Sequence, residues 1–290
     1  MKLTFFVILR MKKQTPVRKR KTSRKKSKGL SLQLKFVFVG IVLVLFSPFY
    51  YGYVLKLTTS AWFWVRHPSE DQSYRTYESY EIKIPKKHHI HGIDVSYYQG
   101  KIDWQKVSAM DEDGVKIDFA FIKATEGILS VDPYFQRNWR EAPKSGIKVG
   151  AYHFFRPQKS GLWQAYFFLQ TVNIEKGDLL PVVDVESLDG VSPERMRKEL
   201  NAFVIRIEER TKVKPIIYSG LKFYQTYLAE YYQGYPFWVA HYHQPKLKLA
   251  DNAWKFWQHS DRARISGINH VVDFNAFNGD SLQFQRMFIP

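Results

Sequence analysis

Eight short β-rich runs recur between residue 90 and the C-terminus, and they constrain the fold more than any other feature. Stretches compatible with helices separate the first six runs, whereas the later connections show little helical pattern. Alternating strands and helices predict a parallel sheet, and eight strands suggest that the sheet closes into a barrel. The runs are HGIDVS (91–96), FAFIKATEG (119–127), KVGAYHFF (148–155), LPVVDVE (180–186), KPIIYSG (214–220), FWVAHY (237–242), WKFWQHS (254–260) and HVVDFNAF (270–277).

One connecting stretch carries clear helix signals. It reads SPERMRKELNAFVIRIEERTK and opens with Ser192 in the N-cap position and Pro193 at the first helical position. Apolar residues then follow at helical spacing. We therefore predict a helix over 192–212.

Polar side chains gather at the ends of the eight runs. Active sites of strand–helix barrels lie at the carboxyl ends of the strands, so these side chains should meet at one mouth. Asp184 and Glu186 are two positions apart and therefore point to the same side of a strand. Burial of such acids is unfavourable unless they are paired, protonated or used. The polar set is Asp94, Ser96, Lys123, Glu126, Tyr152, His153, Asp184, Glu186, Tyr218, His241, Tyr242, Gln258, His259, Asp273 and Asn275.

The N-terminal part has a different composition. Residues 1–35 hold 13 of the 44 Lys and Arg residues and none of the 27 Asp and Glu residues, so they account for most of the net charge of +17. Residues 36–55 contain no charged residue and are long enough to span a bilayer as a helix. Because basic residues before a span stay in the cytoplasm, we predict a cytoplasmic tail over 1–35 and one transmembrane helix over 36–55.

This arrangement places the rest of the chain outside the cytoplasmic membrane, on the periplasmic or cell-wall side. A cleaved signal peptide and a buried core helix are alternatives, but no small-residue cleavage site follows the apolar run. The basic run RKRKTSRKKSKG (18–29) also suits nucleic acid. The adjoining apolar run favours a membrane instead, so we expect no nucleic-acid partner. Met11 opens a conventional basic leader, and we expect translation to start there.

Residues 56–89 are polar and rich in tyrosine, without a clear period. We predict an extracytoplasmic stalk over 56–89 that holds a catalytic domain, residues 90–290, away from the membrane. A short ordered strand in this segment is the alternative. There is no cysteine in the chain, which excludes disulfides and thiolate metal sites.

An ordered set of motifs between about residue 90 and residue 279 resembles the lysozymes of glycoside hydrolase family 25. The resemblance implies an α/β fold, a modified TIM-like (β/α)5(β)3 barrel, here preceded by the transmembrane helix. It also implies hydrolysis of the β-1,4 bond between N-acetylmuramic acid and N-acetylglucosamine in peptidoglycan. The motifs are HGIDVSYYQGKIDW, FAFIKATEG, GAYHFF, PVVDVE, PIIYSG, FWVAHY, WQHS and VVDFNAFNG.

Carried over by position, the resemblance implies that Glu186 is the general acid and Asp184 its partner, with Asp94 and Asp273 as further cleft carboxylates. The seventh motif departs from the family pattern, because His259 stands where a tyrosine is common. Substrate-assisted hydrolysis suits two carboxylates at this spacing. Direct attack by a carboxylate and inversion by water stay open, since the sequence does not give the distance between the carboxyl groups.

Several residues have a structural alternative beside the functional one. We predict a substrate-binding role for Tyr152, Tyr218, Trp238, Gln258 and Glu126, although the aromatic residues also suit a core. Glu126 could instead pair with Lys123. The histidines lack metal-ligand spacing, so we expect no metal and no cofactor.

Three classes of function remain open from the sequence. The first is a membrane-anchored, monomeric muramidase acting on peptidoglycan glycan strands. The second is a chitinase-like glycosidase acting on another N-acetylated polysaccharide. The third is a catalytically silent glycan-binding protein, which the complete set of acids disfavours. We expect the first.

Overall fold

The computed structural model describes residues 31–45 and 73–290, with the exception of residues 243 and 245. The chain divides into two units, residues 1–68 and 69–290. The first contains α1 (Leu32–Leu45). Within the described residues, none of the helices has the length and apolar character needed to cross a membrane. Residues 1–30 of the predicted tail and residues 46–55 of the predicted span lie outside the described residues.

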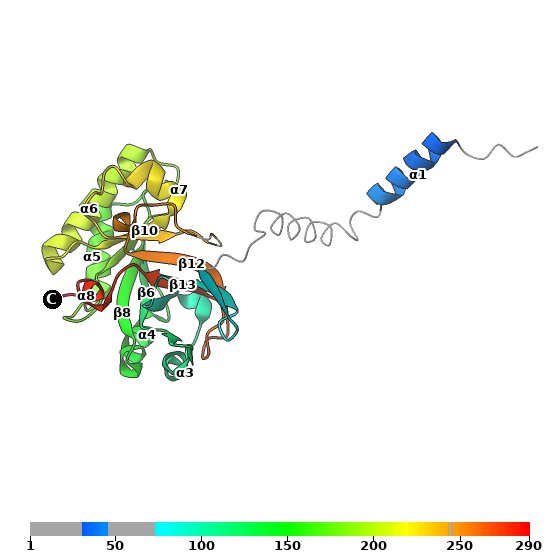
Figure 1. The fold of residues 1–290 in the computed structure, drawn as a ribbon. Coiled ribbons are helices and arrows are strands. Elements are labelled where there is room, and N and C mark those ends of the chain that lie inside the picture. The colour runs from blue at the N-terminus through cyan, green and yellow to red at the C-terminus, as the bar shows by residue number, and fades with distance from the viewer. Residues whose placement is uncertain (1–30, 46–72, 243, 245) are drawn as a thin grey trace, which may run out of the picture. The chain divides into compact units, whose positions relative to one another are not determined.

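Eight strands of the second unit close into a barrel, and each predicted run supplies one strand (Figure 1). The sheet order places β3 beside β13 and also beside β6, which closes the ring. The strands are β3 (His91–Val95), β6 (Phe119–Glu126), β8 (Lys148–Phe154), β9 (Val182–Asp184), β10 (Ile216–Gly220), β11 (Phe237–Ala240), β12 (Phe256–Ala263) and β13 (Val272–Phe277).

The sheet is parallel from β3 through β12, as the sequence predicts, but β13 runs antiparallel to both of its neighbours. The prediction of a wholly parallel sheet is therefore wrong for the last strand. The link from β12 to β13 is short, and a parallel crossover needs about a dozen residues or more. As a result, the first residues of β13, not its last, lie at the carboxyl ends of the other strands.

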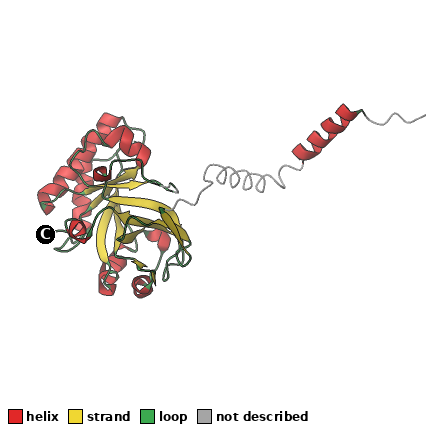
Figure 2. Ribbon diagram, in the orientation of Figure 1, coloured by secondary structure: helices red, strands yellow, loops and turns green. Residues whose placement is uncertain are grey.

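Helices follow each of the first five strands, and in the described part of the chain no α-helix connects the last three strands to one another, which confirms the (β/α)5(β)3 pattern. Figure 2 shows the strands at the centre of the domain with helices packed around them. The helix predicted over 192–212 is α6, and the Ser192 hydroxyl accepts from the backbone N–H of Arg195 as expected of an N-cap. The helices are α3 (Trp104–Ala109), α4 (Phe135–Glu141), α5 (Gly161–Thr171), α6 (Pro193–Thr211) and α7 (Leu221–Phe223), which continues as a π-helical turn (Tyr224–Leu228).

Shorter elements complete the described residues. A C-terminal helix, α8 (Ser281–Gln285), follows the last strand and places Phe284 against the aromatic side chains inside the barrel. Single 3-10 turns occur at Tyr97–Gln99, Pro143–Ser145 and Asp251–Ala253. The minor strands are β1 (Tyr74–Tyr77), β2 (Ile82–Pro85), β4 (Asp111–Glu112), β5 (Val115–Lys116) and β7 (Ser130–Val131).

Residues 73–89, the second half of the predicted stalk, are folded onto the barrel. Strands β1 and β2 form an antiparallel hairpin, so the ordered strand left open by the sequence is what the structure has. Tyr80 at its turn is fully buried, and its hydroxyl donates to the carbonyl of Val115 at 2.7 Å. Its ring packs edge-on against Phe274 of β13. The hairpin thus contacts strands that lack covering helices, and the folded domain begins before residue 90.

Two apolar layers surround the strands. Side chains that point outward from the strands pack under the helices, and those that point inward fill the barrel. Gly92 lies in β3 where a Cβ would stand 2.4 Å from the Phe119 ring, so only glycine fits there. The inner layer gives way to polar side chains toward the mouth. The inner apolar residues are Phe119, Phe121, Leu179, Leu180, Val182, Ile216, Tyr218, Trp238, Ala240, Phe256, Phe277 and Phe284.

Candidate active site

The four carboxyl groups expected to be catalytic meet at the mouth of the barrel. Asp94 lies near the end of β3 and Asp184 ends β9, while Glu186 follows two residues later. Asp273 is the second residue of β13, and the antiparallel register places it directly opposite Asp94. Burial raises the pKa of Asp94, Asp184 and Asp273, and the charge of Glu186 adds to the rise in each, as expected for carboxyl groups that lie near one another.

Asp94 is held by two amide side chains. Its Oδ2 accepts from Gln258 Nε2 at 2.7 Å and from Asn275 Nδ2 at 2.8 Å. Burial raises the pKa of Asp94, and these two hydrogen bonds oppose the rise because they stabilise the charged form. The carboxyl group is therefore fixed in orientation as well as in place.

Two tyrosines fix the amide of Gln258 in turn. The hydroxyls of Tyr218 and Tyr242 donate to Gln258 Oε1 at 2.7 and 2.6 Å, which leaves Nε2 to face Asp94. Gln258 is 2% exposed, so it positions Asp94 and has almost no surface for a substrate. Burial raises the pKa of Tyr218 well above its usual value, and its hydroxyl stays protonated as a donor.

Trp238 lies inside the barrel, which corrects the expectation that it lines the cleft. It is 2% exposed, its ring stacks on Phe121 at 4.6 Å, and its indole N–H donates to Asn275 Oδ1 at 2.8 Å. Tyr218 is also buried beneath the mouth. Both residues support the polar groups above them, and neither ring has a free face for a sugar.

Asp184 and Glu186 occupy different environments. Asp184 is 7% exposed, and its Oδ1 has no hydrogen-bond partner among the described residues. Burial, and secondly the charge of Glu186, raise its pKa well above the usual value. Glu186 is exposed at the rim, yet enough protein surrounds its carboxyl group that burial raises its pKa too, while Tyr218, Lys123 and Arg156 act in the opposite direction. Glu186 is thus the acid that a polymer can reach.

A pocket of about 210 Å³ adjoins the Asp94–Asp273 side of the mouth. Tyr152, predicted to bind substrate, is half-buried and forms part of its wall. Tyr98 stands at the opening with 68% of its surface exposed, stacked on Tyr97 with ring centroids 4.2 Å apart. The lining residues are Asp94, Val95, Ser96, Tyr98, Gln99, Tyr152, Asp261, Val271 and Asp273.

Glu126, the remaining residue predicted to contact substrate, forms ion pairs within the protein. Its Oε2 lies 2.7 Å from Lys123 Nζ, and its Oε1 accepts from the guanidinium of Arg156. The pairing with Lys123 that the sequence left open is therefore present. The histidine at the end of β8, His153, is fully buried and bonded to Thr125 and Gln164. No group of His, Asp or Glu side chains suited to hold a metal ion is found in the part of the chain that the structure describes.

The sequence did not assign roles to three residues that the structure places in or beside the site. The sequence places Asn275 and Tyr242 among the polar residues at the mouth but does not show that they hold Asp94 and Gln258, because those hydrogen bonds join distant parts of the chain. Arg156 lies beyond the end of β8, and no pattern in the sequence distinguishes it from a surface arginine.

A closed strand–helix barrel with carboxyl groups gathered at its mouth, their pKa values raised by burial, is the arrangement of a glycoside hydrolase. The comparisons agree, since the model of glycosyl hydrolases family 25 matches residues 93–268. The chain belongs to this family.

Relatives and solved structures extend the match. The chain is 50% identical to Uncharacterized protein YegX of Escherichia coli (strain K12) over 212 residues, which are 73% of this chain and 78% of the relative. It is 36% identical to Lysozyme M1 of Streptomyces globisporus over 208 residues, which are 66% of this chain and 69% of that protein. The crystal structure of the bacterial lysozyme from Streptomyces coelicolor superposes with a TM-score of 0.63 at 33% identity, covering 68% of this chain and 96% of that one.

Proposed function

We propose that this family 25 hydrolase is a muramidase, with Glu186 as the general acid. It cleaves the β-1,4 bond between N-acetylmuramic acid and N-acetylglucosamine in peptidoglycan. The observation that carries the assignment is the contrast between Glu186, exposed at the rim, and the three carboxyl groups of Asp94, Asp184 and Asp273 gathered beneath it. Glycoside cleavage needs a proton donor at the leaving oxygen and negative charge near the oxocarbenium-like carbon.

Asp184 and Glu186 share one proton in this mechanism. In the free enzyme burial favours the proton on Asp184. When the acetamide N–H of the bound substrate donates to Asp184, the charged form of Asp184 is favoured and the proton resides on Glu186 before the bond breaks. Glu186 gives it to the leaving oxygen while the acetamide oxygen attacks the anomeric carbon and forms an oxazolinium ion. Water then opens this ring and returns a proton to Glu186, with retention of configuration.

The substrate is tested with two polymers. Purified protein is incubated with peptidoglycan and with chitin, and the products are identified by mass spectrometry, with Glu186→Gln as the inactive control. Products of peptidoglycan that end in reducing N-acetylmuramic acid support the proposal. Cleavage of chitin alone would assign a chitinase-like activity, and no cleavage of either polymer would leave a glycan-binding protein.

We further propose that the hydrolase is attached to the cytoplasmic membrane by its N-terminal segment, with residues 56–290 outside. The support is the charge-free stretch 36–55 behind a tail rich in Lys and Arg. Protease added to intact spheroplasts of the host should digest the catalytic domain and leave the anchor. Protection of the domain until lysis would reverse the orientation, and recovery of the whole chain in the soluble fraction would remove the anchor.

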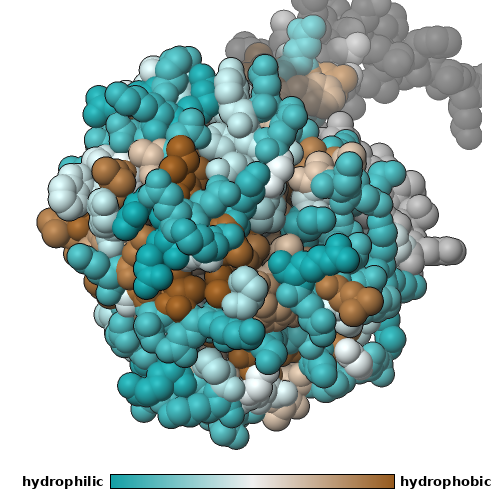
Figure 3. All heavy atoms as spheres, turned by 90° about the vertical axis from the view of Figure 1, so that its left-hand side faces the viewer, coloured by the Kyte–Doolittle hydropathy of each residue, from teal (hydrophilic) through white to brown (hydrophobic). Residues whose placement is uncertain are grey.

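We also propose that the hydrolase is a monomer. Figure 3 views the side that carries α5, α6 and α8, and its apolar patches are divided by hydrophilic side chains. Among the large exposed apolar side chains of α5, α6 and α8 are Trp163, Ile205 and Leu282, which belong to three separate helices. Patches of this kind are ordinary on monomers. Light scattering of the purified domain gives the mass directly, and a mass of two chains would contradict this state.

A further inference from the structure

The loop between β9 and α6 carries Glu186, and a polar cluster holds it. Two backbone positions in the loop have positive φ, Asp189 at 47° and Gly190 at 80°. The Ser187 hydroxyl donates to Asp189 Oδ1, and the side chain of Gln158 donates to the Asp189 carbonyl. Asp189 therefore accepts hydrogen bonds both from within the loop and from a neighbouring segment, and these bonds fix the loop.

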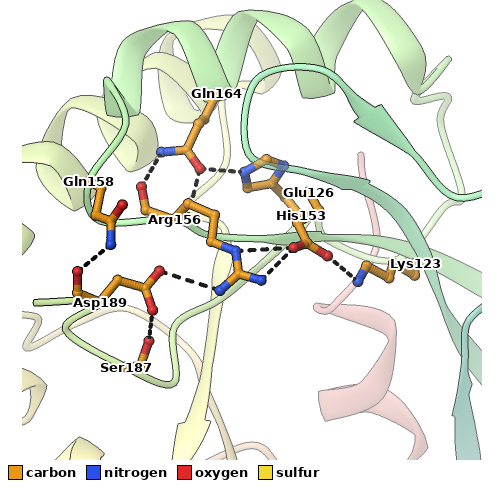
Figure 4. A network of polar contacts seen from close by, with 8 residues as sticks. All are labelled: Lys123, Glu126, His153, Arg156, Gln158, Gln164, Ser187 and Asp189. Carbon is orange, nitrogen blue, oxygen red and sulfur yellow. Dashed lines mark hydrogen bonds and ion pairs between the residues drawn. The ribbon is translucent and has the colours of Figure 1, made fainter.

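Arg156 connects this loop to β6 (Figure 4). Its Nη1 donates to Asp189 Oδ2 at 3.4 Å, while its Nε and Nη2 donate to Glu126 Oε1 at 3.0 and 2.5 Å. The guanidinium lies over the ring of Phe154, 4.6 Å from its centroid. Because a guanidinium is planar and presents its donors in a fixed fork, one side chain can hold two carboxylates in a defined relation.

The backbone of Arg156 is fixed from the other side. Its N–H donates to Gln164 Oε1 at 2.8 Å, and its carbonyl accepts from Gln164 Nε2 at 3.0 Å. Burial lowers the pKa of His153 to about 4, so the ring is neutral. Since Gln164 Oε1 is an acceptor, His153 Nε2 carries the proton and donates to it, and Nδ1 accepts from Thr125 Oγ1 at 2.7 Å. The backbone of Arg156 is thus fixed by hydrogen bonds through the buried side chains of Gln164 and His153.

Glu126 is the anchor at the β6 end of this cluster. Burial alone would raise its pKa, but the hydrogen bonds and charges of Lys123 and Arg156 hold the pKa below its usual value. Glu126 therefore stays ionised and keeps both cations in place. This explains why Glu126 is occupied within the protein rather than turned toward a substrate.

From this geometry we infer that Arg156 is a positioning residue for the general acid: it fixes the loop that bears Glu186 by bridging Asp189 to Glu126. The inference rests on the proposed role of Glu186. In general acid catalysis a small displacement of the proton donor slows the reaction strongly, since a shift of about 1 Å can lower the rate about 100-fold. Arg156 acts through Glu186 and needs no contact with the polymer.

Arg156 also acts on Glu186 through its charge. The positive charges of Lys123 and Arg156 lower the pKa of Glu186, against the rise caused by burial. The other groups that face Glu186 are the hydroxyls of Tyr218 and Tyr242 and the carboxyl groups at the mouth. Removal of Arg156 therefore raises the pKa of Glu186, and the protonated acid persists to higher pH.

The test compares Arg156→Gln, Arg156→Lys and Asp189→Asn with the wild type in steady-state hydrolysis of peptidoglycan fragments across pH. We expect kcat to fall about 10- to 100-fold in all three, with KM changed by less than about threefold. The alkaline limb of the pH profile should move upward in Arg156→Gln only, because Arg156→Lys keeps the cation and Asp189→Asn leaves it in place. Arg140→Gln, which removes an exposed pair with Glu141 on α4, is the matched control and should behave as wild type.

Two outcomes separate the possible failures. A raised KM with unchanged kcat in Arg156→Gln, together with a fully active Asp189→Asn, would make Arg156 a substrate contact and overturn the inference. If Arg156→Gln does not fold, Asp189→Asn is the deciding variant. A fall in its kcat supports the inference, and an unchanged kcat overturns it. Full activity of Glu186→Gln would instead overturn the proposed role of Glu186, whatever the Arg156 variants do.

Discussion

Asp273 lies directly opposite Asp94 across the antiparallel pair of β13 and β3, and the two carboxyl groups interact within hydrogen-bonding reach. Burial raises the pKa of both residues, and the neighbouring charge of Asp94 raises that of Asp273 further. Two carboxyl groups this close do not both ionise readily, so the pair retains a proton near neutral pH. Asp94 keeps the charge, because the amides of Gln258 and Asn275 donate to it.

The pair makes stability depend on pH. In the unfolded chain Asp273 ionises near pH 4. The folded state holds its proton to higher pH, so the stability contributed by that proton is fully present below the unfolded pKa and is lost as pH rises through the folded value. Asp273→Asn has no proton to lose. We compare the unfolding free energy of the variant minus that of the wild type at two pH values. This difference should be larger at about pH 8 than at about pH 4 by at least about 1.4 kcal/mol, the equivalent of one pKa unit.

Chemical denaturation at both pH values measures this difference. Asp280→Asn is a suitable control, because Asp280 is an exposed helix cap away from the acids of the mouth. A constant difference between Asp273→Asn and wild type at the two pH values would show that Asp273 ionises normally in the folded protein.

Glu186→Gln should abolish most of the activity while leaving the fold intact. The substitution keeps the size of the side chain and removes the proton donor, and general acid catalysis is worth about 10²- to 10⁴-fold. Because Glu186 is exposed, the unfolding free energy should change by no more than about 0.5 kcal/mol. Turnover and thermal denaturation of the same preparation check both statements. Wild-type turnover in a folded variant would require another donor.

Asp184→Asn should separate stability from activity. Burial favours the protonated form of Asp184, and an asparagine resembles that form in shape, so the variant should be at least as stable as wild type near neutral pH. Its kcat should fall about 10²- to 10³-fold, because the oxazolinium loses its counter-charge. A thiazoline mimic of the cyclised sugar should bind the variant much less tightly than the wild type. A sugar trapped covalently on a carboxylate would show direct nucleophilic attack instead.

The strands could be predicted from the sequence because each is a short β-rich run with an apolar inner face. The direction of β13 was missed, although the short link after Ala263 leaves no room for a parallel crossover. For residues 74–85 the sequence predicts an ordered strand only as the alternative to a stalk, because the two strands of the hairpin are only four residues long. The hairpin is stabilised by contacts such as Tyr80–Phe274 that are distant in sequence.

The acids of the site could be predicted because chemistry restricts which residue types serve. The depth of a side chain in the barrel could not be predicted. The sequence of β11 and of the residues just after it does not say that Trp238 lies below the mouth and Tyr242 at it. The type of a residue also does not say which side chains it pairs with in the folded protein. The sequence leaves a pairing of Glu126 with the nearby Lys123 open, but only the fold brings Arg156 within reach of Glu126.

The hairpin gives the last prediction, because it links a segment outside the matched family region to the active site. Tyr80 is fully buried against Phe274, the neighbour of Asp273 and Asn275 on β13. Tyr80→Ala should cost about 3–5 kcal/mol of unfolding free energy, as expected for a large aromatic side chain removed from a core. Tyr80→Phe removes only the hydroxyl, which donates to the carbonyls of Val115 and Met110, and should cost about 1–2 kcal/mol. Leu282→Ala, at a site 69% exposed, serves as the control with little change. A loss below about 1 kcal/mol in Tyr80→Ala would mean that the hairpin is an appendage that the barrel does not need.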